Sequence, residues 1–285
     1  MLFGSHVSIA GRIDLAPGRA AQVGCDVLQI FSRSPRGGQP PKLTKDIIKN
    51  YKTNCKKYNI KESYIHAPYF INLASKTPRI RWGSIRVLKE ELERGSSLGV
   101  KYLMTHLGTA RDYGRAKSIE KVIKAVVHIL KGYQGSTQFL LEQSAGAGGE
   151  NGIIGGDLKE LAVILKTANS QLKSAKRAGI CIDTCHAFAM GYNLQTKKSV
   201  NDFVKKIDST IGLANLKLFH FNDSKFGLGE HKDRHEHIGK GQIGQAGFAA
   251  LVNHPKLKNI NVVLETPKDK AGKFDKMNLK LLRSF

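Results

Sequence analysis

Residues 216–241 have the sequence LKLFHFNDSKFGLGEHKDRHEHIGKG, in which a short apolar run passes into a long polar loop. The apolar run LKLF predicts a β-strand that ends near His220. Potential metal ligands then follow closely, at His220, Asp223, Asp233 and His235. Residues two apart point the same way in an extended loop, so Asp233 and His235 can bind one ion together, as imidazole and carboxylate do in catalytic zinc sites. The alternative interpretation is a solvated loop on a basic protein.

The same order, a strand followed by a helix, is predicted along the whole chain. Strands are predicted at 2–10, 27–32, 63–68, 100–108, 136–144, 179–184, 216–223 and 260–267. Helices are predicted at 11–24, 44–60 (with Thr44 as N-cap), 77–99, 117–132, 157–173, 199–212, 245–254 and 276–284. Strands that alternate with helices form a parallel sheet. Eight units in 285 residues predict an α/β fold, a single-domain (β/α)8 TIM barrel over residues 1–285, with an open doubly wound sheet as the alternative.

The charge of the chain indicates a polyanionic partner. The sequence has 46 Lys and Arg against 23 Asp and Glu, a net charge of +23. Self-repulsion of this size is typical of proteins that bind nucleic acid. A membrane surface is disfavoured, because the basic residues are spread over the chain and do not lie on one amphipathic helix. Ribosomal and chromatin-type packing proteins are equally basic, so charge alone does not identify an enzyme.

The four cysteines, Cys25, Cys55, Cys181 and Cys185, form no CxxC pair, and no signal peptide precedes them. A reducing, cytoplasmic location is therefore expected. Cys181 and Cys185 flank Asp183 and could be ligands, but small buried side chains are the favoured interpretation. No apolar run approaches the roughly 20 residues that span a bilayer, so no membrane partner is expected.

The barrel prediction puts functional residues at one rim, because active sites of this fold lie at the C-terminal ends of the strands. Nine side chains that can bind a metal end a predicted strand or follow one closely: His66, His106, Glu142, Asp183, His186, His220, Asp233, His235 and Glu265. A single histidine after a strand is usually a structural residue. The convergence of nine residues on one rim indicates a metal centre. His6, on the first predicted strand, points into the barrel by alternation and is expected to support the ligands.

Several motifs resemble those of endonuclease IV, the zinc-dependent apurinic/apyrimidinic endonuclease family of base-excision repair. They occur in the family's order over essentially the whole chain: GSHVS (4–8), HAPYFINL (66–73), HLG (106–108), LEQSAGAGG (141–149), CIDTCHAFAMGY (181–192), HFNDSK (220–225), DRHEHIGKGQIG (233–244) and LETP (264–267). The long motifs around residues 181–192 and 220–244 are specific, whereas short ones such as LETP are not.

The resemblance implies three zinc ions per chain, with manganese as an alternative at one or more of the sites. The implied ligands of the first ion are His66, His106 and Glu142. The implied ligands of the second ion are Glu142, as a bridge, with Asp183, His220 and Glu265. The implied ligands of the third ion are His186, Asp233 and His235. Glu142 and Glu265 are the carboxylates to which the resemblance gives a catalytic role.

The implied reaction is hydrolysis of the phosphodiester 5′ to an abasic site in double-stranded DNA, which leaves a 3′-hydroxyl and a 5′-deoxyribose phosphate. Removal of blocked 3′ ends is expected as well. A phosphodiester is anionic and repels hydroxide, and two metal ions roughly 3.5–4 Å apart can neutralise it and activate a water. The expected protein acts as a monomer.

Recognition of an abasic site needs groups that sense a missing base. The stretch SRSPRGGQP carries Arg33 and Arg36 without a carboxylate nearby in sequence, and Tyr69 and Phe70 follow His66. By resemblance, Arg36, Tyr69 and Phe70 are the DNA-binding residues that enter the minor groove and fill the space of an extruded nucleotide. The family often has an aliphatic residue at the position of Phe70. Ordinary packing of the loop on the barrel is the alternative for both aromatic residues.

Two rival functions remain open from the sequence. The first is a sugar isomerase, which has the same barrel and uses divalent metals with carboxylate and histidine ligands. A basic rim disfavours it, because small neutral sugars need no such field. The second is an inactive DNA-binding zinc protein, which the complete set of ligand residues disfavours.

Overall fold

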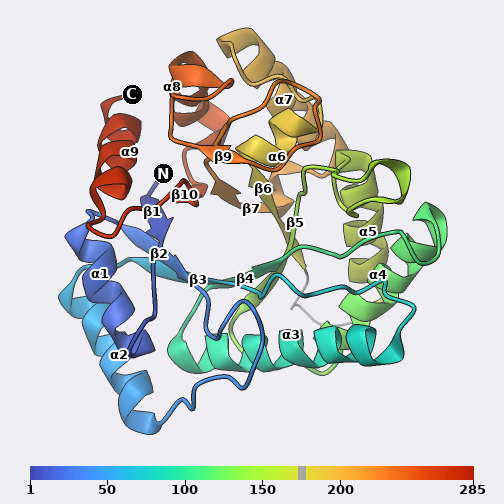
Figure 1. Cartoon of the computed structure of the whole chain (residues 1–285), viewed down its shortest axis with the longest axis horizontal. Coiled ribbons are helices and arrows are strands. Elements are labelled where there is room, and N and C mark those ends of the chain that lie inside the picture. The colour runs from blue at the N-terminus through green and yellow to red at the C-terminus, as the bar shows by residue number, and fades with distance from the viewer. Residues whose placement is uncertain (173–177) are drawn as a thin grey trace.

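The computed structural model describes residues 1–172 and 178–285, and its strands form a closed parallel barrel (Figure 1). Around the barrel the strands are ordered β1-β10-β7-β6-β5-β4-β3-β2. Their bounds are β1 Phe3–His6, β2 Val27–Ile30, β3 Glu62–His66, β4 Tyr102–Thr105, β5 Gln138–Glu142, β6 Gly179–Asp183, β7 Leu216–His220 and β10 Asn261–Leu264. Because β1 pairs with both β2 and β10, the sheet has no free edge. The predicted (β/α)8 barrel is confirmed, and the open sheet is wrong.

Helices surround the strands in the described part of the chain (Figure 1). Their bounds are α1 Ala16–Gln22, α2 Lys45–Lys57, α3 Pro78–Leu98, α4 Arg115–Leu130, α5 Leu158–Ser170, α6 Thr184–Ala189, α7 Lys197–Thr210, α8 Gly244–Val252 and α9 Lys273–Ser284. Thr44 caps α2, as predicted, by accepting a hydrogen bond from the Ile47 N–H. The last residue of the predicted helix 157–173 lies outside the described residues. Across those same residues, no helix has the length and apolarity needed to cross a bilayer.

Two features of the fold differ from the sequence prediction. The strands are shorter than predicted: β1 ends at His6 and β4 at Thr105. The apolar residues beyond those ends, such as Val7 and Leu107, are buried, and the Val7 N–H still donates to the Gln29 carbonyl of β2 at 2.8 Å. The short helix α6 was not predicted. It begins directly after β6, where the Asp183 carboxylate caps it by accepting a hydrogen bond from the His186 N–H.

Side chains of alternate strand residues fill the barrel interior. Tyr64 and Tyr102 stack there with ring centroids 5.6 Å apart. The interior cluster consists of Val27, Tyr64, Tyr102, Met104, Leu140, Cys181, Leu218 and Val263. Cys181 is thus a small buried side chain, as favoured from the sequence. The opposite strand faces pack against the helices. Active sites of such filled barrels lie at the carboxyl ends of the strands.

Candidate metal centre

Six of the nine predicted ligands lie at the carboxyl ends of six different strands. Four are the last residues of their strands, and two follow directly after strands. We call this set the strand-end group: His66, His106, Glu142, Asp183, His220 and Glu265. The parallel register aligns neighbours within it; for example, Asp183 of β6 pairs with His220 of β7. The barrel therefore brings together residues that lie far apart in the sequence.

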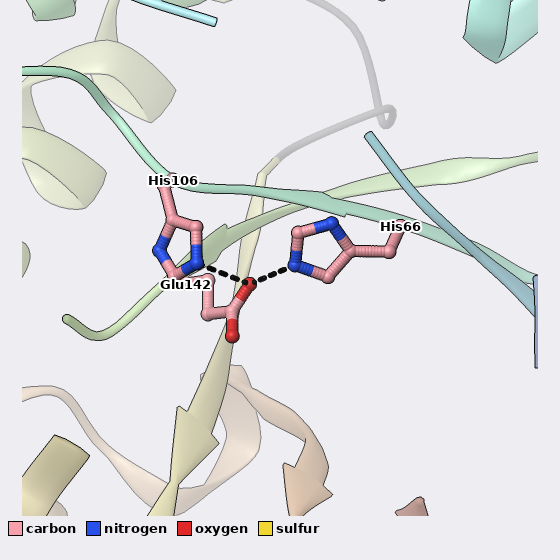
Figure 2. Close-up of side chains that lie close together, drawn as sticks. All are labelled: His66, His106 and Glu142. Carbon is pink, nitrogen blue, oxygen red and sulfur yellow. Dashed lines mark hydrogen bonds and ion pairs between the residues drawn. The ribbon is translucent and has the colours of Figure 1, made fainter. Parts of the chain in front are cut away.

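Glu142 lies at the middle of the strand-end group. Its Oε2 is 2.8 Å from His66 Nε2 and 3.9 Å from His106 Nε2, and Figure 2 shows both rings directed at this one oxygen. Its other oxygen, Oε1, is 3.0 Å from His220 Nδ1. His66 Nδ1 lies 2.6 Å from the Ala67 carbonyl. Because a carbonyl oxygen can only accept, that nitrogen donates, and Nε2 is the nitrogen available to a cation.

Two sets of potential ligand atoms meet at Glu142. Each set has its atoms within 4.8 Å of one another: His66, His106 and Glu142 in the first, and Glu142, Asp183, His220 and Glu265 in the second. The two oxygens of Glu142 face different sets. One buried carboxylate thus contributes to two neighbouring sites, an arrangement that can hold two cations close together.

The remaining predicted ligands form the loop group: His186 on α6, and Asp233 and His235 on the long loop after β7. Asp233 Oδ1 lies 3.3 Å from His186 Nε2 and 3.4 Å from His235 Nε2. His235 Nε2 is also 3.6 Å from Asp183 Oδ2, so the loop group touches the strand-end group through Asp183. The Sγ of the buried Cys185 lies within 4.8 Å of potential ligand atoms of Asp233 and His235.

Asp223 anchors the loop that carries Asp233 and His235. It begins a short antiparallel ribbon of β8 Asp223–Ser224 with β9 His235–Glu236. Its buried carboxylate accepts hydrogen bonds at 2.8–3.3 Å from five backbone N–H groups: Ser224, Gly239, Gly241, Ile243 and Gly244. A Cβ on Gly241 would lie 2.3 Å from the Ser224 carbonyl oxygen, so only glycine permits this approach. Asp223 was one of four potential ligands from the sequence; the structure corrects this, because its oxygens are occupied by the backbone.

The charges of the centre favour ionised carboxylates. Burial alone would raise the pKa of the Glu142 carboxyl, but the surrounding histidines, His106 foremost, hold this pKa well below its usual value. Burial would lower the pKa of His186, but the carboxylates of Asp183 and Asp233 raise it to about 10. Without a cation, histidine protons balance the carboxylates. Binding of a metal ion at such a site would replace those protons.

Imidazole nitrogens that lack a hydrogen bond, those of His186 and His235, support a metal at this rim. Among the described residues, six buried side-chain atoms lack a hydrogen-bond partner, and three of them belong to the centre: His106 Nδ1, His186 Nε2 and His235 Nε2. A buried polar atom without a partner costs roughly 1–3 kcal/mol. A cation near Asp233 would satisfy the nitrogens of His186 and His235. Histidine and carboxylate are the donor types that zinc accepts, so the residues fit a divalent metal such as zinc.

Two residues that the sequence did not single out orient the ligands. Gln29, buried on β2, donates from Nε2 to Glu265 Oε1 (2.6 Å) and accepts at Oε1 from His220 Nε2 (2.8 Å). This fixes the proton of His220 on Nε2 and turns Nδ1 toward Glu142. Asn222 donates to Asp183 Oδ2 at 2.6 Å and accepts from the Glu265 backbone N–H. Neither amide is a preferred metal ligand, so no ligand pattern in the sequence indicates either residue.

His6 lies where its strand position predicted. Its Nδ1 is 3.7 Å from Glu265 Oε1 and 3.0 Å from Gln29 Nε2. Its ring also packs on Phe31, with centroids 4.4 Å apart. Alternation along the strand was therefore sufficient to place this side chain beside the metal centre.

Of the predicted DNA-contact residues, Tyr69 lines the cavity over the metal centre, whereas Arg36 and Phe70 line a neighbouring one. The cavity over the metal centre measures about 590 Å³ and is lined by His66, His106, His186, Asp233, His235 and Tyr69 among others. Tyr69 is 68% exposed and Phe70 41% exposed, and the Tyr69 ring packs edge-on against Phe31 with centroids 5.2 Å apart. Arg36 is exposed, whereas Arg33 is buried and ion-paired with Glu90 and Glu91. No carboxylate lies near Arg33 in sequence, but α3 supplies Glu90 and Glu91 from far along the chain.

Comparison with known proteins reveals relatives over the full length. The family model of the xylose isomerase-like TIM barrel matches residues 17–284. A protein of Halothermothrix orenii curated as "Probable endonuclease 4" is 38% identical over 99% of both chains. Endonuclease IV from Thermus thermophilus has a similar structure, with a TM-score of 0.86, 30% identity and coverage of 100% of this chain and 98% of that one. D-psicose 3-epimerase from Clostridium cellulolyticum (TM-score 0.69, 15% identity, coverage of 100% and 99%) shares the fold alone.

Proposed function

This chain belongs to the endonuclease IV family of the xylose isomerase-like TIM barrels, and from that premise we propose that it is a zinc-dependent apurinic/apyrimidinic endonuclease of DNA repair. It would hydrolyse the phosphodiester 5′ to an abasic site in double-stranded DNA, leaving a 3′-hydroxyl and a 5′-deoxyribose phosphate. We propose also that it removes blocked 3′ ends, and that residues 1–285 act as one metallo-endonuclease domain, as a monomer in the cytoplasm.

The observation that carries the proposal is the shared position of Glu142 between two sets of ligand atoms. We propose His66, His106 and Glu142 for one zinc ion, with manganese as the alternative. We propose Glu142 with Asp183, His220 and Glu265 for a second ion. We propose His186, Asp233 and His235 for a third, where the distances of 3.3 and 3.4 Å to Asp233 Oδ1 are supporting evidence.

When bound, these ions would supply an activated water, neutralise the phosphate and stabilise the departing 3′-oxygen. The chain's own contribution is to hold the charges in place. Glu142 and Glu265, the proposed catalytic carboxylates, are kept ionised by the histidines beside them. Gln29 keeps the His220 proton on Nε2. Burial of Glu142 and His220 excludes water, and in such a site fixed charges act more strongly than in solvent.

Recognition of the lesion is proposed for the loops after β2 and β3. Tyr69 and Phe70 are exposed beside the cavity, and Arg36 lies on the neighbouring loop. Aromatic side chains that enter between bases offset the cost of unstacking, which is least where no base pair has to break. We propose that Tyr69, Phe70 and Arg36 occupy the gap at an abasic site and so select it.

The net charge of +23 supports DNA over a sugar as substrate. A sugar epimerase shares the barrel at only 15% identity, whereas a curated endonuclease relative reaches 38%. The charge also predicts how binding responds to salt. If six to ten phosphates are contacted, the affinity should fall by roughly 10³–10⁵-fold between 50 and 200 mM salt.

One experiment tests the function directly. The purified protein is incubated with a duplex that carries one abasic site, with and without a chelator, and the products are resolved on a gel. The proposal expects a chelator-sensitive cut on the 5′ side of the lesion with a 3′-hydroxyl end. A lyase-type product with an unsaturated 3′ sugar, or aldose–ketose conversion without DNA cleavage, would contradict it.

A further inference from the structure

A second cavity adjoins the metal cavity. It includes Arg36 and Phe70 of the proposed lesion-recognition residues, but its wall on α3 has no role assigned above. It measures about 580 Å³, against about 590 Å³ for the metal cavity, and Arg33 lines both. Its walls are the loop after β2, at residues 33–40, and the first half of α3. Tyr69 lines the metal cavity, whereas its neighbour Phe70 lines the second one. These two neighbouring aromatic residues thus line different cavities.

The second cavity is electropositive. Arg36, Arg79 and Arg86 line it, and of the described lining residues one, Glu90, carries a carboxylate. The Glu90 carboxylate is 2.9 Å from the buried Arg33 guanidinium, which neutralises the charge of Glu90. Arg86 is 3.9 Å from Glu90 in an exposed pair, and such pairs contribute little.

Two of these arginines have no partner among the described residues. Within residues 1–172 and 178–285, the side chains of Arg36 and Arg79 make no hydrogen bond or ion pair. By contrast Arg33, Arg94 and Arg115 are each paired with a glutamate. Arg36 and Arg79 therefore remain available to an external anion, and Arg86 has only its exposed pair with Glu90.

Apolar groups lie between the arginines. Phe70 and Ile80 line the cavity and are 41% and 46% exposed. A Cβ on Gly37 would be 3.9 Å from the Phe70 ring, so this ring lies against the glycine loop. Basic groups interleaved with aromatic and apolar surface are typical of grooves that follow a nucleic-acid backbone.

We propose that this second cavity is a binding subsite for the phosphodiester backbone of the DNA that flanks the lesion, with Arg79 and Arg86 of α3 as phosphate contacts. Phosphates recur about every 3.4 Å along a strand. A strand held in the metal cavity therefore continues over the surface next to it, and the shared wall at Arg33 makes the second cavity continuous with that path. The identity of the ligand as DNA rests on the proposed function.

The test is a double substitution, Arg79→Ala with Arg86→Ala, which removes two charges and leaves every proposed metal ligand in place. Binding of an abasic duplex and of an undamaged duplex of equal length is titrated at several salt concentrations. Loss of two phosphate contacts should reduce the slope of log affinity against log salt by about 2 on both duplexes. Arg79→Lys with Arg86→Lys keeps the charge and should restore most of the slope.

The matched control is Lys205→Ala with Lys206→Ala on the exposed face of α7, which removes the same charge and should leave the slope near that of the unmodified protein. A shortened flank gives a second measure. Trimming the duplex on the side that reaches the subsite should weaken binding by the unmodified protein, but not by the alanine variant.

An alanine variant with the unmodified slope and flank dependence would overturn the subsite, and so would an equal loss in the lysine control. Failure of the unmodified protein to cut any abasic duplex would instead contradict the proposed function. The slope on undamaged DNA would still decide on the subsite in that case.

Discussion

The strand-end group and the loop group of the metal centre are built in different ways. Glu142, His220 and Asp183 are fully buried, and each is fixed by a strand end and by hydrogen bonds to neighbours. Asp233 of the loop group has a side chain that is 43% exposed, and His186 Nε2 and His235 Nε2 lack hydrogen bonds. The strand ends of the barrel position the first group, whereas two of the three residues of the second lie on a loop that Asp223 and the β8–β9 ribbon hold.

Different parts of the fold position the ligands of the two groups. A parallel barrel positions strand ends through its register, so their ligands are preorganised before any ion binds. The loop group gains its position from the Asp223 carboxylate and the β8–β9 ribbon. We therefore expect substitutions in the strand-end group to impair the chemical step. Substitutions that weaken the loop should instead displace the ligands of the loop group.

The largest effect is expected for Glu142→Gln. Gln keeps the shape but loses the charge that two sets of ligands share, so cleavage should fall by more than the roughly 10²–10³-fold typical of losing one electrostatic contact. DNA affinity should change little, because backbone contacts position the substrate and do no chemistry. Metal content, abasic-duplex affinity and single-turnover cleavage measure these outcomes.

Glu150→Gln, on the glycine-rich loop a few residues away, is the control for this prediction and should stay near the unmodified protein. A Glu142→Gln protein that keeps its full metal content and cleaves at the normal rate would overturn the shared role of Glu142. The strand-end group would then have no larger role in the chemical step than the loop group.

A smaller effect is expected for Asp223→Asn, which weakens the anchor of the loop group. One acceptor oxygen becomes a donor that faces backbone N–H groups, so stability should fall by roughly 2–3 kcal/mol. Displacement of the loop by about 1 Å would reduce cleavage by roughly 10²-fold. Thermal unfolding and metal content test this, with Asp202→Asn on the exposed face of α7 as control. Unchanged metal content and activity would show that the loop group does not depend on Asp223.

Gln29→Leu tests the preorganisation of the strand-end group. It removes the acceptor for His220 Nε2 and the donor to Glu265, and loss of such an orienting partner typically costs roughly 10–100-fold in metal affinity or activity. Competition with a chelator measures the affinity independently of cleavage. A chelator sensitivity equal to that of the unmodified protein would mean that the barrel alone orients His220.

The smallest effect is expected for Tyr69→Ala, which removes no ligand of either group. Stacking of one aromatic residue on a base contributes roughly 1–3 kcal/mol, so abasic-duplex binding should weaken about tenfold while binding to undamaged duplex changes less. Metal content should be that of the unmodified protein. Equal losses on both duplexes would assign Tyr69 to general DNA binding instead of lesion recognition.

The sequence determined the strand-end group and the barrel beneath it. Eight alternating units predicted a parallel sheet, and parallel strands present all their carboxyl ends at one rim, so His66, Glu142 and His220 could be brought together without knowledge of the packing. Alternation along one strand was enough to place His6 beside them. Both features follow from local sequence patterns, because the geometry of parallel strands fixes where strand ends and alternate side chains lie.

The tertiary structure alone decided which polar side chains pair across the barrel. Gln29 meets His220 across 191 positions of sequence, Asp223 turns to the backbone and not to the ions, and Arg33 is neutralised by Glu90 and Glu91 of α3. The helix α6, which presents His186, begins because Asp183 caps it. Such pairings follow from barrel closure and from which elements become neighbours, and a local sequence pattern contains neither.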